Sequence, residues 1–323
     1  RSRTGSVRFS ADDTRSLLAE LGLRIPTAGV PTLRLVWPSD TAPAPGSDTE
    51  VVLGLRPGID TAELLDGFRR EAPDLLLELP ALATVGVDGT AITRTETLLG
   101  SGLWEIRIDG RCWWEHRGPS ARWLVPVVDG EVVPVREEVL RAPTRSDEEL
   151  SLPAIVVADV PMQPDRRRLL PAAHVEDVAR GYAEFVRALP AEQRLELVPV
   201  PGFARSDTDR RIREAVLEEL RTHPWLPAAD GGPDLLPDRA TALPGLTADL
   251  ADALADVVPG LVPPALCGPR HAPALASVDV HRIGPARVAD LLAGHDREPR
   301  WWYRLYEALT PLVVDAVVAE ELA

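Results

Sequence analysis

The chain has 323 residues, a formal net charge of -15 at pH 7, and 35 cationic side chains that are all arginine. The acidic balance argues against a surface that coats nucleic acid, because phosphate binding needs concentrated cations. The absence of lysine excludes Schiff-base chemistry and the lysine of a P-loop. No apolar run approaches the roughly 18 residues that span a bilayer, so we expect neither a membrane nor a nucleic acid among the partners.

Cysteine usage and the first residues indicate where the protein works. Only Cys112 and Cys267 are present, far apart in the sequence, which excludes a disulfide scaffold and a cysteine-rich zinc module. We therefore expect a reducing, cytoplasmic compartment. The chain begins Arg1-Ser-Arg-Thr, without Met and without the charged and apolar segments of a signal peptide. This beginning predicts a piece of a longer protein.

The first ninety residues predict mixed helices and strands. Ser10 is expected to cap a helix that Gly22 ends, and Asp60 is expected to cap a second helix. Residues 50–55 are β-branched and apolar, which indicates a buried strand. Further strands are expected at 5–9, 33–37 and 83–87, with a loop over 38–48.

Short strands separated by turns are expected next. The turn signals Asp109-Gly110 and Asp129-Gly130 favour an antiparallel meander between residues 90 and 135. Its expected strands are 103–108, 112–115, 122–128 and 132–135. A continuous apolar run then predicts a strand over 152–157 that is buried on both faces.

Helices dominate the rest of the chain. Apolar residues at helical spacing predict one amphipathic helix over 175–189, followed by a strand over 195–200. Ser206 is expected to cap another helix, and Trp225 is expected to be buried. Three further helices are predicted at 247–258, at 285–293, and at 299–322 with a break at Pro311.

Most chemical motifs are absent from the sequence. The six histidines show no H-x-x-x-H or H-x-x-E-H spacing, so no metal site is expected. No G-x-S-x-G marks a nucleophile, and no G-x-G-x-x-G marks a phosphate loop. The run Arg166-Arg167-Arg168 allows two interpretations. It is either a solvated turn paired with Asp165, or it presents an arginine that binds a phosphate, because guanidinium stays charged and binds phosphate bidentately.

Three segments resemble the ninety-kilodalton heat-shock chaperone and the sacsin-type group of the gyrase, heat-shock chaperone, histidine kinase and MutL (GHKL) superfamily. Residues 48–56, the helix after Asp60 and the strand at 83–87 look like the elements that close a Bergerat ATP-binding fold. Thr49 matches the Gly-Thr motif of that fold, with Asp48 in place of the usual glycine. Thr49 is therefore implied to bind the cofactor.

The second segment, residues 159–166, is similar to the middle-domain loop Asp-Leu-Pro-Leu-Asn-x-Ser-Arg. In that family the terminal arginine contacts the γ-phosphate of ATP, a role that falls here on Arg166, with Arg167 and Arg168 as register alternatives. Gln163 stands at the asparagine position and is implied to bind the cofactor. The helix at 175–189 is the third segment, and the C-terminal part looks like actinobacterial sacsin-type proteins.

The resemblance implies an α/β (α+β) protein of three parts. Residues 1–90 would be the end of an ATP-binding domain, 91–200 a transducer-like middle domain, and 201–323 a mostly helical unit. ATP and magnesium are implied as cofactors of the full-length protein. This chain lacks the magnesium helix and the glycine-rich lid, so it is not expected to bind ATP or hydrolyse it alone. Protein clients or partner domains and a possible homodimer are implied. The alternative is a non-catalytic protein-interaction module.

Overall fold

The computed structural model describes residues 1–23, 26, 30, 32–171 and 173–312. It mixes helices and strands, as expected for an α+β protein. The chain forms two compact units, Arg1–Leu64 and Leu65–Ala323, whose boundary falls inside helix α2 (Thr61–Glu78). Among the described residues, no helix has the length and apolarity needed to cross a membrane.

The first unit contains one helix and a two-stranded sheet. Strand β1 (Ser6–Arg8) pairs antiparallel with β2 (Trp37–Ser39). Helix α1 (Ala11–Glu20) begins where the Ser10 hydroxyl accepts a hydrogen bond from the Asp13 amide at 3.1 Å, which confirms the predicted cap. The predicted strand over 33–37 is wrong, because Thr32–Arg34 forms a 3-10 turn (η2) and only residue 37 enters a strand.

The predicted buried strand over 50–55 is also wrong. These residues form no helix or strand, and the Val51 and Leu53 side chains are 75% and 78% exposed. β-branched composition favours a strand only where a neighbouring strand and a covering layer exist. Residues 50–55 therefore do not form the strand that the chaperone resemblance implies for this segment.

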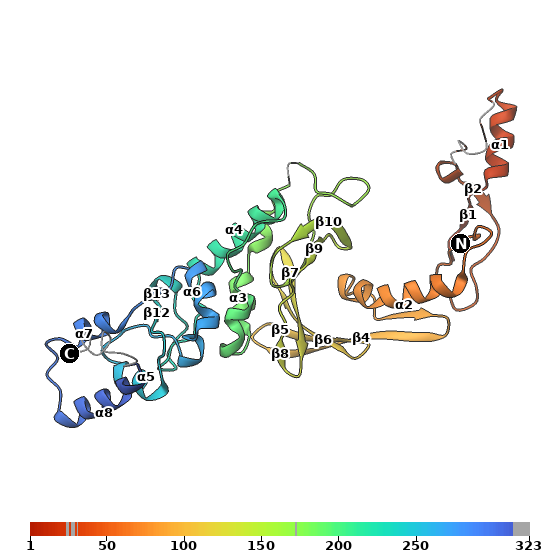
Figure 1. Ribbon diagram of the computed structural model, residues 1–323. Coiled ribbons are helices and arrows are strands. Elements are labelled where there is room, and N and C mark those ends of the chain that lie inside the picture. Colours follow the sequence, from red (N-terminus) through yellow and green to blue (C-terminus); the bar gives the residue numbers. More distant parts are fainter. Residues whose placement is uncertain (24–25, 27–29, 31, 172, 313–323) are drawn as a thin grey trace. The chain divides into compact units, whose positions relative to one another are not determined.

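A nine-stranded sheet is the centre of the second unit (Figure 1). Its order is β10-β9-β11-β7-β6-β5-β4-β3, with β8 on β7, and β9 and β11 form the only parallel pair of this sheet in the described part of the chain. The strands are β3 (Thr84–Val87), β4 (Thr90–Gly100), β5 (Leu103–Ile108), β6 (Arg111–Arg117), β7 (Ala121–Val128), β8 (Glu131–Val132), β9 (Glu138–Arg141), β10 (Arg145–Leu150) and β11 (Ile155–Ala158).

The predicted antiparallel meander is confirmed, except that the strand expected over 132–135 is wrong beyond residue 132, because β8 ends there. Its turns are formed by Asp109 and Asp129, which have φ angles of 50° and 53° and are each followed by glycine. The length of β4 and the β9–β10 pair were not predicted. Because β3 pairs with β4 around residue 90, one sheet runs through the position expected to separate two domains.

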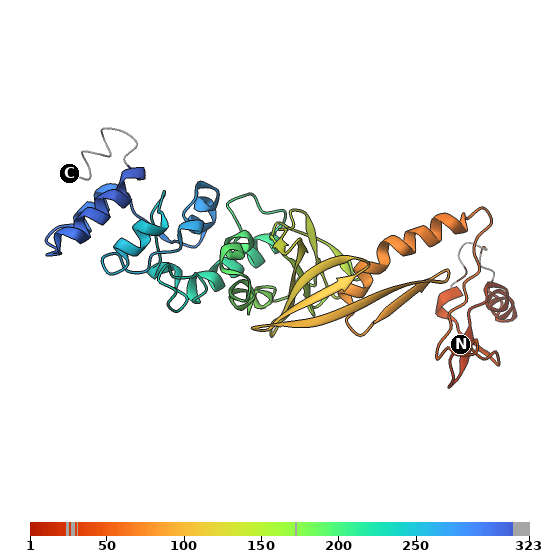
Figure 2. The same cartoon turned by 90° about the horizontal axis from the view of Figure 1, so that it is seen from below.

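Helices cover both faces of this sheet (Figures 1 and 2). Strand β7 shows the alternation, since Leu124 packs in the core beneath α2 while Trp123 and Val125 pack in the opposite core. In that opposite core Trp123 contacts Tyr182 edge-to-face, with ring centroids 4.6 Å apart. The same apolar core continues from β5 to the C-terminal helices, so it also runs through the expected boundary at 200.

The helix predicted over 175–189 is broken in two. A 3-10 turn, η3 (Glu176–Ala179), is followed by α3 (Tyr182–Ala188), and Gly181 between them has a φ of 85°. A Cβ at this glycine would lie 3.0 Å from a ring carbon of Pro119, so the close approach also favours glycine. The apolar spacing was interpreted correctly, but hydrophobic periodicity cannot reveal a single residue in the left-handed conformation. The strand predicted over 195–200 is wrong, because Ala191–Leu197 is a 3-10 helix (η4).

The C-terminal part is mostly helical, as predicted. Helix α4 (Asp207–Thr222) is capped by Ser206, and Trp225 is buried with its indole N–H donating to the Leu220 carbonyl at 2.8 Å. Helix α8 (Pro299–Leu309) ends before a 3-10 turn at Thr310–Leu312, and the rest of the predicted 299–322 helix lies outside the described residues. The remaining elements are α5 (Ala248–Leu254), α6 (Ala272–Ser277), α7 (Pro285–Leu292) and the parallel pair β12 (Thr241–Ala242) and β13 (His281–Arg282).

Candidate functional site

The three consecutive arginines lie on a closed loop between β11 and η3, which we call the arginine loop (residues 161–170). The Gln163 amide donates to the Arg168 carbonyl and the Arg166 amide donates to the Gln163 carbonyl, both at 2.8 Å. The Leu170 amide donates to the Pro161 carbonyl at 2.9 Å. Arg166 has a φ of 58°, in the left-handed region, which lets the chain reverse at this point. These bonds give the loop the form of a tight hairpin.

Strand β10 holds the arginine loop in place. The Asp147 amide donates to the Arg167 carbonyl at 2.8 Å, and the Leu169 amide donates to the Glu148 carboxylate at 3.2 Å. The Leu169 side chain is buried in the core. The loop is therefore anchored through its backbone and through one apolar side chain. Its guanidinium groups are not needed to hold it in place.

The Arg166, Arg167 and Arg168 side chains are exposed, and within the described ranges none forms an ion pair. Asp165, the expected ionic partner, instead accepts a hydrogen bond from the Arg167 amide at 3.0 Å and closes the turn. The first interpretation is therefore half correct, since the turn is solvated but its arginines are not paired with Asp165. Three adjacent like charges remain at one end of the sheet.

The other two predicted site residues are positioned differently. The Gln163 side-chain amide donates to the Leu169 carbonyl at 3.3 Å, so it braces the arginine loop from inside. Thr49 belongs to the first unit, where it forms an isolated antiparallel bridge with Ser2. Gln163 and the arginines are thus brought together on one loop of the second unit, whereas Thr49 belongs to the first unit.

A second cluster joins α3 and α4. One potential ligand atom from each of Glu184, Glu219 and His223 lies within 4.8 Å of the others. The Gly181 amide donates to the Glu219 carboxylate at 3.0 Å, and the His223 Nδ1 lies 2.9 Å from the Glu219 carbonyl. Two carboxylates and an imidazole could hold a divalent cation. No metal site was expected, because the histidines show no paired spacing. The signal that could have indicated one is the spacing of four between Glu219 on α4 and His223, the residue that follows the end of this helix.

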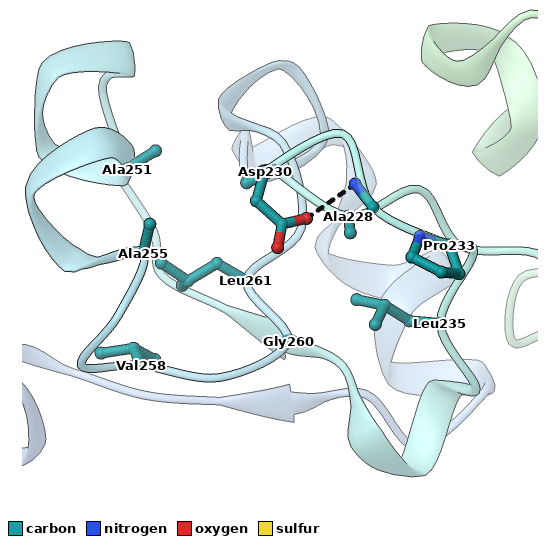
Figure 3. Close-up of a pocket in the computed structure, with 11 residues that line it drawn as sticks. Ala228, Asp230, Pro233, Leu235, Ala251, Ala255, Val258, Gly260 and Leu261 are labelled. Atoms are coloured by element: carbon teal, nitrogen blue, oxygen red, sulfur yellow. Dashed lines mark hydrogen bonds between the residues drawn. The ribbon is translucent and has the colours of Figure 1, made fainter.

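A small cavity of about 100 Å³ lies in the C-terminal part (Figure 3). Its walls are mostly apolar and come from the turn at 228–235, from α5 and from Gly260 and Leu261. The carboxylate of Asp230 is engaged by the Gly232 amide at 2.9 Å. The cavity is well below the roughly 300–1,000 Å³ of usual ligand pockets, so it is not a candidate site.

A larger groove of about 650 Å³ lies between α2 and β3, and we call it the α2 groove. Behind its α2 wall, Arg141 is almost fully buried, and its guanidinium lies 3.1 Å from Asp74, 3.2 Å from Glu78 and 2.9 Å from Glu138. Burial raises the pKa of Glu78 to about 7, although the charge of Arg141 acts in the opposite direction. A carboxyl group with a shifted pKa in a groove is a candidate functional group.

Sequence reasoning did not find the α2 groove, although the sequence contains a signal for it. Phe68, Glu71, Leu75 and Glu78 follow one another at spacings of three and four, which places them on one face of a helix. An acidic and apolar stripe of this kind is easily assigned to a solvated face.

No family model, curated protein or solved structure matches the chain. The likeness to chaperone-type ATPases therefore depends on the motif residues alone.

Proposed function

We propose that this chain is the middle portion of a sacsin-like, chaperone-type ATP-binding protein, and that the arginine loop contacts the terminal phosphate of ATP held by another domain. The observation that carries the proposal is the set of three exposed guanidinium groups, unpaired within the described ranges, on a loop closed by its own backbone. They occur in a chain of net charge -15, where carboxylate partners are abundant.

The charge of the three arginines and the closed backbone of the loop together support a phosphate contact. Adjacent guanidinium groups repel one another, and an anion between them relieves the repulsion while accepting bidentate hydrogen bonds. Because the arginine loop is already closed and anchored, little backbone freedom is lost when the anion binds. The exposed arginines of the loop fit a phosphate group, and the chaperone resemblance implies that the nucleoside is held by another domain. ATP and magnesium therefore belong to the domain that supplies the rest of the site.

In phosphoryl transfer, such an arginine stabilises the charge that develops on the transferred group. Only contacts that strengthen in the transition state raise turnover, so the arginine acts on the rate more than on ATP affinity. Closure of the ATP-binding domain onto the loop would couple nucleotide binding to a conformational change in this middle domain.

The chain alone is expected to bind inorganic triphosphate weakly at low ionic strength, and to show no micromolar, stoichiometric binding of ATP with magnesium by calorimetry. The triple variant R166A/R167A/R168A is expected to lose the triphosphate signal. The matched control is R111A/R282A/R300A, which removes three exposed arginines that form no ion pair in the described part of the chain. Both variants change the net charge equally. Equal loss in both would show that binding is non-specific and would contradict the proposal.

In the protein that joins this chain to an ATP-binding domain, Arg166→Ala is expected to lower ATP turnover by at least about tenfold, with little change in ATP affinity. Arg166→Lys should restore only part of the rate, since it keeps the charge and loses the bidentate fork. Arg167→Ala and Arg168→Ala test the register. The test is to measure steady-state turnover and ATP affinity for each variant. Three alanine variants that all hydrolyse ATP like the parent would refute the phosphate contact.

A second candidate function is the non-catalytic protein-interaction module. It is favoured by the α2 groove, which is large, open and lined by apolar side chains with carboxylates among them. No residue of the arginine loop is among those that line this groove, so the two features can be tested separately.

A further inference from the structure

The α2 groove has an apolar surface built from both of its walls. The aromatic ring of Phe68 lines it although the side chain is 53% exposed, while Ala72 and Leu76 further along the same helix are buried against the sheet. Exposed aromatic groups that line a concave surface are typical of binding sites. The apolar residues lining the groove are Leu65, Phe68, Ala72, Leu75, Val85 and Val87.

Negative charge surrounds this apolar surface. Four carboxylates line the groove, those of Glu71, Asp74, Glu78 and Asp88, against the single guanidinium of Arg145. Arg145 lies 3.1 Å from Glu138, a carboxylate that does not line the groove, and 4.0 Å from Asp74. Its charge is therefore already shared.

The carboxylates of the groove differ in how far they are neutralised. Asp88 pairs with Arg69 at 3.3 Å, and a single nitrogen of Arg141 serves both Asp74 and Glu78. Glu71 is exposed and forms no ion pair within the ranges that the structure covers. The groove thus keeps an excess of negative charge beside its apolar surface, and its complement is an apolar group next to a cation.

We propose that the α2 groove binds a basic amphipathic segment of a partner protein. The apolar side chains of that segment pack against Phe68 and Leu75, and its arginine or lysine side chains meet Glu71 and the shared carboxylates. Charge complementarity selects this occupant over an acidic or a purely apolar one, because an acidic segment would meet the carboxylates that line the groove. The proposal does not depend on the phosphate contact of the arginine loop.

Binding of such a segment depends on pH in a defined direction. Glu78 faces Asp74 on its own helix, and Glu138, Arg141 and Arg145 from the β9–β10 region. A cation in the groove favours the ionised form of Glu78, so affinity should rise as pH increases from 6 to 8. A purely apolar contact would not change in this range.

The probe is a 15-residue amphipathic helix of leucine and arginine, and the comparison peptide carries glutamate in place of arginine. We expect the whole chain to bind the Leu/Arg peptide, as followed by fluorescence anisotropy at moderate ionic strength, and to bind the Leu/Glu peptide at least tenfold more weakly. Glu71→Arg and Phe68→Ser are each expected to raise the Kd at least tenfold. Both side chains are exposed, so the fold should persist, and circular dichroism checks this.

The matched control is Glu131→Arg, which makes the same charge change at an exposed position on β8. It should leave the Kd nearly unchanged, and R166A/R167A/R168A should bind the peptide no more weakly than the parent. Equal weakening by Glu71→Arg and Glu131→Arg would show general attraction to an acidic protein and would overturn the proposal. Absence of peptide binding would overturn it as well. Self-association that Glu71→Arg abolishes would assign the groove to a second copy of the chain instead.

Discussion

Replacing Glu115 by alanine is expected to lower the free energy of unfolding of the second unit by about 3–5 kcal/mol, the usual cost of breaking a buried ion pair. The Glu115 carboxylate is fully buried and serves three arginines. Its oxygens lie 2.5 Å from Arg122 Nε, 3.0 Å from Arg117 Nε and 3.8 Å from Arg94 Nη2. Arg94 keeps Glu96 as a partner at 2.8 Å, but the largely buried Arg122 has no other carboxylate partner in the described part of the chain, so removing Glu115 leaves that guanidinium poorly compensated.

The same network fixes the position of α2. Arg122 donates to the carbonyls of Leu77 at 2.8 Å and Glu78 at 3.1 Å, at the C-terminal end of the helix. A cation there satisfies free carbonyls and complements the helix dipole. Because Glu115 orients Arg122, its loss should also loosen the α2 wall of the groove. Peptide binding by Glu115→Ala should therefore weaken together with stability.

Urea denaturation followed by tryptophan fluorescence measures the effect. The control is Glu105→Ala, which removes a strand carboxylate that pairs with the exposed Arg107. Exposed ion pairs contribute little, so this variant should unfold nearly like the parent. A Glu115 variant that loses no more stability than the Glu105 variant would show that the network does not anchor α2.

Elements with strong local signals could be predicted from the sequence. The aspartate–glycine turns at 109 and 129 fixed the register of the meander, and the hydroxyls of Ser10 and Ser206 marked two helix starts. The strand predicted over residues 50–55 was wrong because strand propensity does not say whether a partner strand is present. The prediction of one continuous helix over 175–189 was wrong because one glycine in a left-handed conformation interrupts the helix without changing the apolar spacing.

One candidate site could be found from the sequence, and the other could not. The arginine loop was found because three consecutive arginines are visible without any knowledge of the fold. What the sequence could not supply was its closure by backbone hydrogen bonds and the use of Asp165 as a turn acceptor. The α2 groove needs α2 to pack on the sheet, and that packing depends on residues far away in the sequence, such as Leu124 and Val157. The expected pairing of Asp165 was wrong for a related reason, since a carboxylate can satisfy a nearby backbone amide as well as a guanidinium.

Replacing Glu78 by glutamine is expected to stabilise the protein at pH 8 and to change little at pH 5. Burial raises the pKa of Glu78 to about 7 from an ordinary value of 4.5, so the folded state favours the protonated form. The stability that Glu78 contributes is fully present below pH 4.5 and is lost as pH rises through 7. Linkage bounds the loss at about 3 kcal/mol, because each pKa unit corresponds to roughly 1.4 kcal/mol.

Glutamine resembles the protonated carboxyl group in shape and can still accept the hydrogen bond from Arg141, which keeps Asp74 and Glu138 as charged partners. The difference in unfolding free energy between variant and parent should therefore grow as the pH rises from 5 to about 7 and level off towards pH 8 in urea titrations. Glu71→Gln removes an exposed carboxylate from the same helix and reports the effect of charge removal alone. Peptide affinity in the Glu78→Gln variant should lose its rise between pH 6 and 8, because the titrating group is gone. A stability difference that is constant across this range would mean that Glu78 stays ionised in the fold, and the pH dependence inferred for the α2 groove would then be wrong as well.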